Sequence, residues 1–240
     1  MRTSPPPRAD APNAPRVIAV GSGRGGSGKT TVALGLAHAL ASGFGRRVAM
    51  VDLDHQGSLT LYAGARPVAD PLTAEPVVTH GISLFRGGEP LAGATAAQLL
   101  RHLRRAEVDA DEVLVDLPPS LTDPSHAAVL SRPADLLVIV AELEPGSLQP
   151  ASKLRAMAEA AGVAVLVLPN KDNARGVTGG TLMVLQGAFG REMASVAIKD
   201  LAAAPESISK RKPVTAHRPK APISQALYAV ARDLVENGAK

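Results

Sequence analysis

Short runs of apolar residues recur along the chain, and longer stretches with helical spacing separate them. None of these runs alternates apolar with polar residues, and uninterrupted runs are typical of strands buried on both faces. The runs are 17–20, 48–51, 113–115, 136–140 and 163–168. The stretches that predict helices are about 30–42, 94–108, 122–131, 147–161, 177–188 and 223–236.

The alternation of strand and helix predicts an α/β fold, a doubly wound and mostly parallel sheet with helices on both faces. No fixed-period repeat or internal linker interrupts the pattern, so we predict a single domain over 16–240. Five prolines in residues 1–15 indicate a flexible leader, because proline lacks the backbone donor that helices and central strands use. Residues 64–93 have four prolines and weak periodicity, and no element is predicted there.

Composition narrows the possible functions of this 240-residue chain. Hydrophobic residues make up 45% and charged residues 20%, which indicates a globular protein. The chain has no Cys, which excludes disulfides, Cys-ligated zinc, iron–sulfur clusters and thiol catalysis. No apolar run reaches the ~18 residues of a membrane span, and the first 16 residues lack the apolar stretch of a secretory signal. We therefore expect a soluble cytoplasmic protein that does not associate with membranes.

Positive charge is concentrated near one end of the chain. The window 199–220 holds six basic and two acidic residues, so its net charge equals the +4 of the whole chain. The basic residues are Lys199, Lys210, Arg211, Lys212, Arg218 and Lys220. Such a segment suggests a polyanionic partner, and a solvated surface loop is the alternative reading.

A glycine-rich segment follows the first apolar run. Residues 23–30 fit the pattern Gly-x-x-x-x-Gly-Lys-[Ser/Thr] between a strand and a helix, which predicts a phosphate-binding loop (P-loop). Glycines let successive backbone N–H groups point at phosphate oxygens, and the helix N-terminus adds its positive dipole end. We expect Lys29 to bridge the β- and γ-phosphates and Thr30 to ligate Mg²⁺. The residues predicted to bind the nucleotide in this segment are Gly25, Gly26, Ser27, Gly28, Lys29, Thr30 and Thr31.

Carboxylates follow two further apolar runs. Asp52 and Asp54 end the second run, and side chains at i and i+2 of a strand point the same way. Asp116 ends the third run in the Walker B pattern, where it would hold Mg²⁺ through a water. Each acid alone is also compatible with a solvated loop. Together with the phosphate-binding loop they predict a Mg²⁺–nucleotide site at the carboxyl edge of the sheet.

These motifs, taken in order, resemble the ParA/MinD family of deviant Walker-type P-loop ATPases, and most closely the small ParA-type partition ATPases. The family's phosphate loop resembles Arg24–Thr30, its Asp-x-Asp-Pro-Gln-Gly motif resembles Asp52–Gly57, and its Asp-x-Pro-Pro-Ser-Leu motif resembles Asp116–Leu121. A looser match joins the family's Glu-Ala-…-Gly-Lys-Pro-Val segment to Glu206–Val214, and Tyr228 falls in the expected last helix.

The resemblance implies an ATPase that binds ATP and Mg²⁺ in a sandwich homodimer and hydrolyses ATP slowly until a ParB-like partner stimulates it. Asp54 would position the attacking water, Asp52 and Asp116 would organise Mg²⁺, and Asn170 would contact adenine. The dimer would bind double-stranded DNA without sequence preference, so the protein would be nucleoid-associated. The residues expected to contact DNA are Lys210, Arg211, Lys212, Arg218 and Lys220.

Three positions depart from the family pattern. Arg24 replaces the signature lysine that reaches the partner's nucleotide, and we expect it to contact phosphate across the dimer, although arginine is bulkier and planar. His55 replaces a proline beside Asp54, where it would either hydrogen-bond near the γ-phosphate or have no role. Ile198-Lys199 replaces an Ile-Pro pair, which leaves that side of the adenine contact open.

Four other functions would each require a feature that the motifs above do not supply in full. A GTPase would need Asn-Lys-x-Asp, and the segment 170–173 fails at Asn173. A MinD-like membrane ATPase would need a basic amphipathic C-terminal helix, whereas 223–236 has an apolar stripe without a basic polar face. A metabolic P-loop enzyme would need a substrate pocket, for which 64–93 is the one candidate segment. A non-enzymatic DNA-binding module would need a degenerate phosphate loop.

Overall fold

A seven-stranded sheet forms the centre of the computed structural model, which describes residues 14–131, 134–173, 176–199 and 202–238. The strands are β1 (Arg16–Gly21), β2 (Val48–Asp52), β3 (Val77–Thr79), β4 (Ile82–Phe85), β5 (Glu112–Asp116), β6 (Leu136–Glu142) and β7 (Ala164–Asn170). Their order is β3-β4-β2-β5-β1-β6-β7. Neighbouring strands pair in parallel, except that β3 pairs antiparallel to β4 at one edge.

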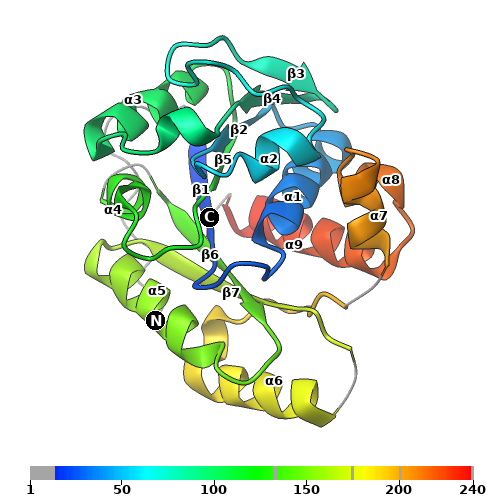
Figure 1. Ribbon diagram of the computed structural model, residues 1–240. Coiled ribbons are helices and arrows are strands. Elements are labelled where there is room, and N and C mark those ends of the chain that lie inside the picture. Colours follow the sequence, from blue (N-terminus) through cyan, green and yellow to red (C-terminus); the bar gives the residue numbers. More distant parts are fainter. Residues whose placement is uncertain (1–13, 132–133, 174–175, 200–201, 239–240) are drawn as a thin grey trace.

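Helices cover both faces of this sheet. They are α1 (Lys29–Phe44), α2 (Ser58–Tyr62), α3 (Ala96–Ala106), α4 (Pro124–Leu130), α5 (Leu148–Ala160), α6 (Gly176–Phe189), α7 (Ala203–Ser209), α8 (Val214–His217) and α9 (Pro222–Gly238), with short 3₁₀ turns η1 (Glu89–Leu91) and η2 (Gly190–Glu192). In Figure 1, α3, α4 and α5 lie on one side of the sheet, and α1, α7, α8 and α9 lie on the other. Among the described residues, no helix has the length and apolar character needed to cross a membrane.

Alternate residues of each central strand enter two separate hydrophobic clusters. Val17 and Ala19 of β1 pack with residues of α3, α4 and α5, whereas Ile18 and Val20 pack with residues of α1 and α9. A strand whose two faces are both covered must be apolar at every position, which explains the uninterrupted runs in the sequence. The predicted doubly wound, mostly parallel sheet is therefore confirmed.

The structure contains elements that the hydrophobic pattern did not predict. The five apolar runs fall on β1, β2, β5, β6 and β7, and the six helical stretches fall on the longer helices. Residues 64–93 contain the hairpin β3–β4 and η1. These elements are three or four residues long, which is too short for a periodic pattern. The predicted leader over 1–15 falls almost entirely outside the described residues, and the domain boundaries stay a prediction.

Candidate nucleotide-binding site

The predicted phosphate-binding loop connects β1 to α1 in a backbone conformation that depends on glycine. Gly26 and Gly28 have φ values of 77° and 85°, in the left-handed region. A Cβ on Gly28 would lie 2.5 Å from Nδ2 of Asn170, so no larger residue fits there. On the other side of the loop, a Cβ built on Gly25 or Gly26 would meet no atom within 4 Å, and this side is open to a ligand.

A buried ion pair lies beneath this loop. Lys29 Nζ donates to Asp116 Oδ1 at 2.6 Å, and Thr30 Oγ1 donates to Asp116 Oδ2 at 2.9 Å. The Lys29 side chain is 6% exposed and that of Asp116 is fully buried. Burial raises the pKa of Asp116, while the ammonium of Lys29 opposes this effect. Lys29 is thus held at Asp116 in this structure, and it also lines the pocket beside the loop.

Asp52 anchors the segment that follows β2. Its Oδ2 accepts hydrogen bonds from Thr60 N at 2.9 Å and Thr60 Oγ1 at 2.7 Å, and its Oδ1 accepts one from Asp54 N at 3.2 Å. Burial raises the pKa of Asp52 to about 7, the nearby Asp116 carboxylate adds to this, and the Thr60 hydrogen bonds oppose it. Both oxygens of Asp52 are engaged with protein groups, and its expected role at the metal stays a prediction.

Asp54 reaches the pocket that the loop surrounds. Its Oδ1 accepts a hydrogen bond from Gln56 N at 2.9 Å, and the residue is only 4% exposed. Nδ1 of the neighbouring His55 lies 3.8 Å from the same oxygen, and the His55 side chain is 44% exposed. Asp54 is therefore held by its own turn while its carboxylate borders the open space.

The pocket has a volume of about 330 Å³, within the usual range for small-molecule sites. It brings together the whole predicted segment Gly25–Thr31 with Arg24 and Asp54. Sequence reasoning missed further lining residues, which are Gln56, Ser58, Tyr62, Pro119 and Ile208. Most of these follow the Asp52–Asp54 motif or lie on the short helices α2 and α7, where no periodic pattern marks them.

The pocket offers donors that suit a nucleotide with Mg²⁺. Among the described residues, no group of three or more His, Cys, Asp or Glu side chains could hold a metal ion by itself. Mg²⁺ instead commonly uses one or two protein oxygens together with phosphate and water oxygens. Thr30 Oγ1 lines the pocket, and the Asp116 carboxylate lies directly behind it, with 2.9 Å between Thr30 Oγ1 and Asp116 Oδ2.

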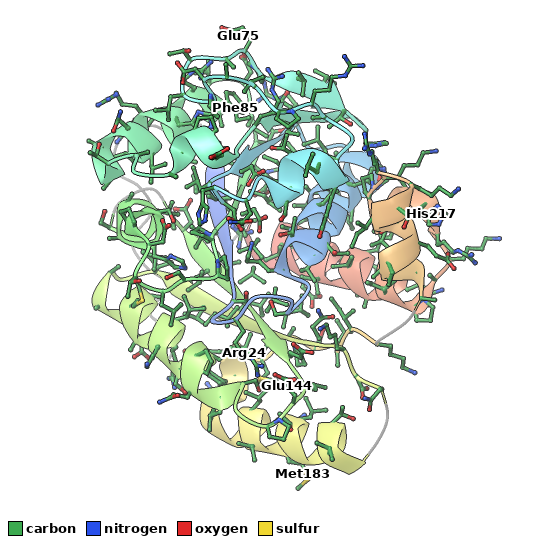
Figure 2. All side chains as sticks on the ribbon, viewed as in Figure 1. Arg24, Glu75, Phe85, Glu144, Met183 and His217 are labelled. Carbon is green, nitrogen blue, oxygen red and sulfur yellow. The ribbon has the colours of Figure 1, made fainter. Side chains whose placement is uncertain are left out.

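Arg24 and Asn170 have partners within the chain. Arg24 forms an ion pair with Glu144, which follows β6, and Figure 2 shows the two side chains next to each other. Asn170 Nδ2 donates to Ser27 O at 2.6 Å, so Asn170 supports the phosphate-binding loop from behind. Their expected contacts with the partner's phosphate and with adenine stay predictions. Ile198, at the third departure from the family pattern, is buried, and Lys199 beside it is exposed.

The five predicted DNA-contacting residues lie in the two connections that flank α8, between α7 and α8 and between α8 and α9. All five side chains are exposed: Lys210, Arg211, Lys212, Arg218 and Lys220. Arg211 has a φ of 52°, in the left-handed region, and ends α7 at the position where the family segment has glycine. Arg218 Nη2 lies 2.8 Å from Glu206 Oε2 of α7. We call these five residues the basic surface; α7, which borders it, also contributes Ile208 to the pocket.

The fold and the loop define a P-loop nucleotide-binding α/β protein. The sequence pattern of the CobQ/CobB/MinD/ParA nucleotide-binding domain matches residues 18–218. The chain therefore belongs to this family, and the resemblance inferred from the motifs is confirmed.

Individual relatives within the family carry different names. The chain is 38% identical over 140 residues to the chromosome-partitioning ATPase Soj of Thermus thermophilus, covering 53% of this chain and 55% of Soj. It is 40% identical over 126 residues to the maintenance of carboxysome distribution protein A of Gloeobacter kilaueensis, covering 52% and 48%. The matches thus span about half the length of these relatives. An iron–sulfur cluster carrier protein of Deinococcus radiodurans is 28% identical over 247 residues, covering 93% and 70%.

A solved structure supports the fold. The septum site-determining protein MinD of Pyrococcus horikoshii, complexed with Mg-ADP, superposes with a TM-score of 0.78 over 93% of this chain and 97% of MinD. The two sequences are 22% identical, so this likeness establishes the shared fold.

Proposed function

We propose that the chain is a Mg²⁺-dependent ATPase whose ATP-bound homodimer binds duplex DNA without sequence preference and positions a cargo along it. The observation that carries this proposal is the arrangement of Lys29, Thr30 and Asp116 beneath an open glycine loop with Asp54 at the rim. A lysine for the phosphates, a hydroxyl and a carboxylate for Mg²⁺, and a residue that orients the attacking water are recurring parts of phosphoryl-transfer sites.

The residues of the chain have distinct tasks in this reaction. Lys29 exchanges Asp116 for a phosphate, which places a positive charge where negative charge grows in the transition state. Asp116 and Thr30 would hold Mg²⁺, which would supply Lewis-acid stabilisation of the phosphates. Asp54 holds the attacking water, because its carboxylate is fixed by Gln56 N and borders the pocket. In the dimer, Arg24 leaves Glu144 and contacts the partner's nucleotide.

DNA binding is supported by the basic surface and by the likeness to Soj. Contacts between basic side chains and phosphates suffice for binding without sequence preference, and such binding weakens steeply with salt. Soj and the carboxysome distribution protein have names that refer to different cargoes, so the type of cargo stays open. A ParB-like partner would stimulate hydrolysis and release the dimer from nucleoid DNA in the cytoplasm.

The test is retention of duplex DNA of arbitrary sequence by the purified protein with ATP, ADP or no nucleotide, at two salt concentrations. We expect tight, salt-sensitive binding with ATP only. A variant carrying Arg211→Glu and Arg218→Glu should lose DNA binding and keep ATP binding. Equal DNA binding in all nucleotide states would contradict the nucleotide switch, and loss of ATP binding in the variant would mean that the basic surface is structural.

The alternatives find less support in the structure. The apolar stripe of α9 is buried in the core, with Ile223, Leu227, Val230 and Leu234 at most 5% exposed, so it is not free to enter a membrane. A cavity of about 560 Å³ is lined partly by residues of 64–93, but it lies at the start of β2, away from the phosphate-binding loop. An iron–sulfur carrier role is not supported, because the chain has no Cys to ligate a cluster.

A further inference from the structure

One acidic side chain lies within the basic surface and holds one of its arginines. Between residues 202 and 220, Glu206 is the single acidic residue of the sequence. Its Oε2 lies 2.8 Å from Arg218 Nη2 and 3.5 Å from His217 Nε2. Figure 2 places His217 among the nitrogen-bearing side chains that project from the side of α7 and α8.

These residues share a hollow on the protein surface. It has a volume of about 840 Å³, and Glu206, His217, Arg218 and Lys220 line it together with the start of α9. Glu206 comes from α7, and Arg218 follows α8, so the ion pair joins two elements across the hollow. A phosphate group that entered the hollow would meet two cations and one carboxylate.

The ion pair is of the kind that exchanges easily. The side chains of Arg218 and Glu206 are 56% and 42% exposed, and exposed pairs contribute little to stability. Arg218 can therefore leave the carboxylate for a phosphate at little cost to the fold. In this position the Glu206 carboxylate would compete with a DNA phosphate for the guanidinium and would repel the charge of that phosphate.

We propose that Glu206 is a positioning residue that holds Arg218 when DNA is absent and lowers the affinity of the basic surface for DNA. The inference rests on the proposed function, since it concerns the same surface. When the protein binds DNA, a backbone phosphate takes the place of the Glu206 carboxylate on Arg218. Glu206 thus keeps binding weak enough to be reversed.

The test uses Glu206→Gln in the full chain with a non-hydrolysable ATP analogue and a short DNA duplex. Glutamine keeps the length of the side chain and an oxygen that can accept a hydrogen bond, so the fold is preserved. We expect DNA affinity to rise about two- to fivefold. The slope of log affinity against log salt should not change, because Arg218 contacts the same phosphate in both complexes.

The matched control is Glu236→Gln. Glu236 is exposed on α9, and the substitution changes the net charge by the same amount. It lies 14 residues after Pro222, which borders the hollow, and this corresponds to about 21 Å along the helix. That distance is about two Debye lengths at 0.1 M salt, so Glu236→Gln should leave DNA affinity unchanged.

A double-mutant cycle with Arg218→Gln shows whether Glu206 acts through Arg218. In the Arg218→Gln background we expect Glu206→Gln to raise DNA affinity less than twofold. An equal gain in both backgrounds, or a gain as large from Glu236→Gln, would overturn the inference and indicate a general charge effect.

Two further outcomes separate the inference from the function on which it rests. If the unmodified chain binds DNA and Glu206→Gln does not change its affinity, the inference is wrong and the proposed function stands. If neither protein binds DNA with the ATP analogue, both are overturned. Unchanged ATP-analogue binding by Glu206→Gln verifies that the pocket beside α7 is intact.

Discussion

The pocket and the basic surface organise charge in opposite ways. Beneath the phosphate-binding loop, Lys29 and Asp116 are almost completely buried, and hydrogen bonds engage both carboxylate oxygens. On the basic surface, the charged side chains are exposed, and Arg218 has its partner Glu206 in solvent contact. In the pocket, the charged groups find nearly all their hydrogen-bond partners within the protein. On the basic surface, most charged groups are exposed to solvent and accessible to a ligand.

The difference follows from the cost of desolvation. A buried charge without a partner is expensive, so the residues around Lys29 must be present together and in one geometry. An exposed charge costs little to leave alone and gains little from a partner. Loss of a charge should therefore affect both stability and catalysis in the pocket. On the basic surface it should affect DNA binding alone, and stability should change only where a substitution alters the backbone.

The largest effect is expected from Lys29→Met. ATP hydrolysis should fall about 10²- to 10³-fold, because a charge that stabilises the transition state is removed. The free energy of unfolding should also fall by about 3 kcal/mol, because Asp116 stays buried without its cation. Hydrolysis assays and urea unfolding would measure the two effects. Lys212→Met, the same change on the basic surface, should alter neither; a similar loss of stability there would contradict the comparison.

Asp54→Ala should separate hydrolysis from nucleotide binding. The Asp54 carboxylate borders the pocket without joining the Lys29–Asp116 pair, so ATP affinity should change by less than about threefold. Hydrolysis should fall about 10²-fold, the usual contribution of a group that orients or deprotonates the nucleophile. Single-turnover kinetics beside equilibrium binding of ATP would show this. Loss of binding as large as the loss of hydrolysis would mean that Asp54 is structural.

Asp52→Asn should change how stability depends on pH. The folded protein keeps the Asp52 proton up to about pH 7, whereas the unfolded chain loses it near pH 3.8. The free energy of unfolding therefore falls as pH rises between these values. Asparagine has no proton to lose, so the variant should lack this fall and gain roughly 4 kcal/mol relative to the natural chain between pH 4 and pH 7.5. Urea unfolding at several pH values would measure it, with the exposed Asp109→Asn as the control that keeps the slope.

The smallest effects are expected from Arg211→Gly, with opposite signs in the two properties. Arg211 has a left-handed backbone, which costs an arginine more than a glycine, so the free energy of unfolding should rise by up to about 1 kcal/mol. DNA affinity should fall about fivefold through the loss of one phosphate contact. Lys212→Gly, where the backbone is not left-handed, should lower both. If Arg211→Gly were more stable but bound DNA with unchanged affinity, Arg211 would not be a DNA-contacting residue.

Much of the fold and the loop could be predicted from local sequence. Three local features are recognisable from a few neighbouring residues. They are the apolar runs of the buried strands, the glycine pattern of the loop, and the carboxylates at the ends of β2 and β5. The hairpin β3–β4 and the helices α2 and α8 could not be predicted, because three to five residues are too few for a periodic pattern. Helix α7 is as long as the predicted α4, but Ile208 is its single large apolar residue, so it shows no apolar stripe. Thr60 was missed for a related reason, since it is recognised only by its contact with Asp52.

The sequence by itself determined five of the seven strands, the order of the motifs and the family, because an apolar run or a glycine-rich loop is recognisable within a few residues. Only the tertiary structure decided which charges meet: Lys29 with Asp116, Arg24 with Glu144, and Arg218 with Glu206. These residues lie far apart in the chain or on separate elements, and the parallel sheet and its loops bring them together. The Coulomb energy between two charges depends on their separation and on how deeply they are buried, and neither quantity exists until the chain has folded.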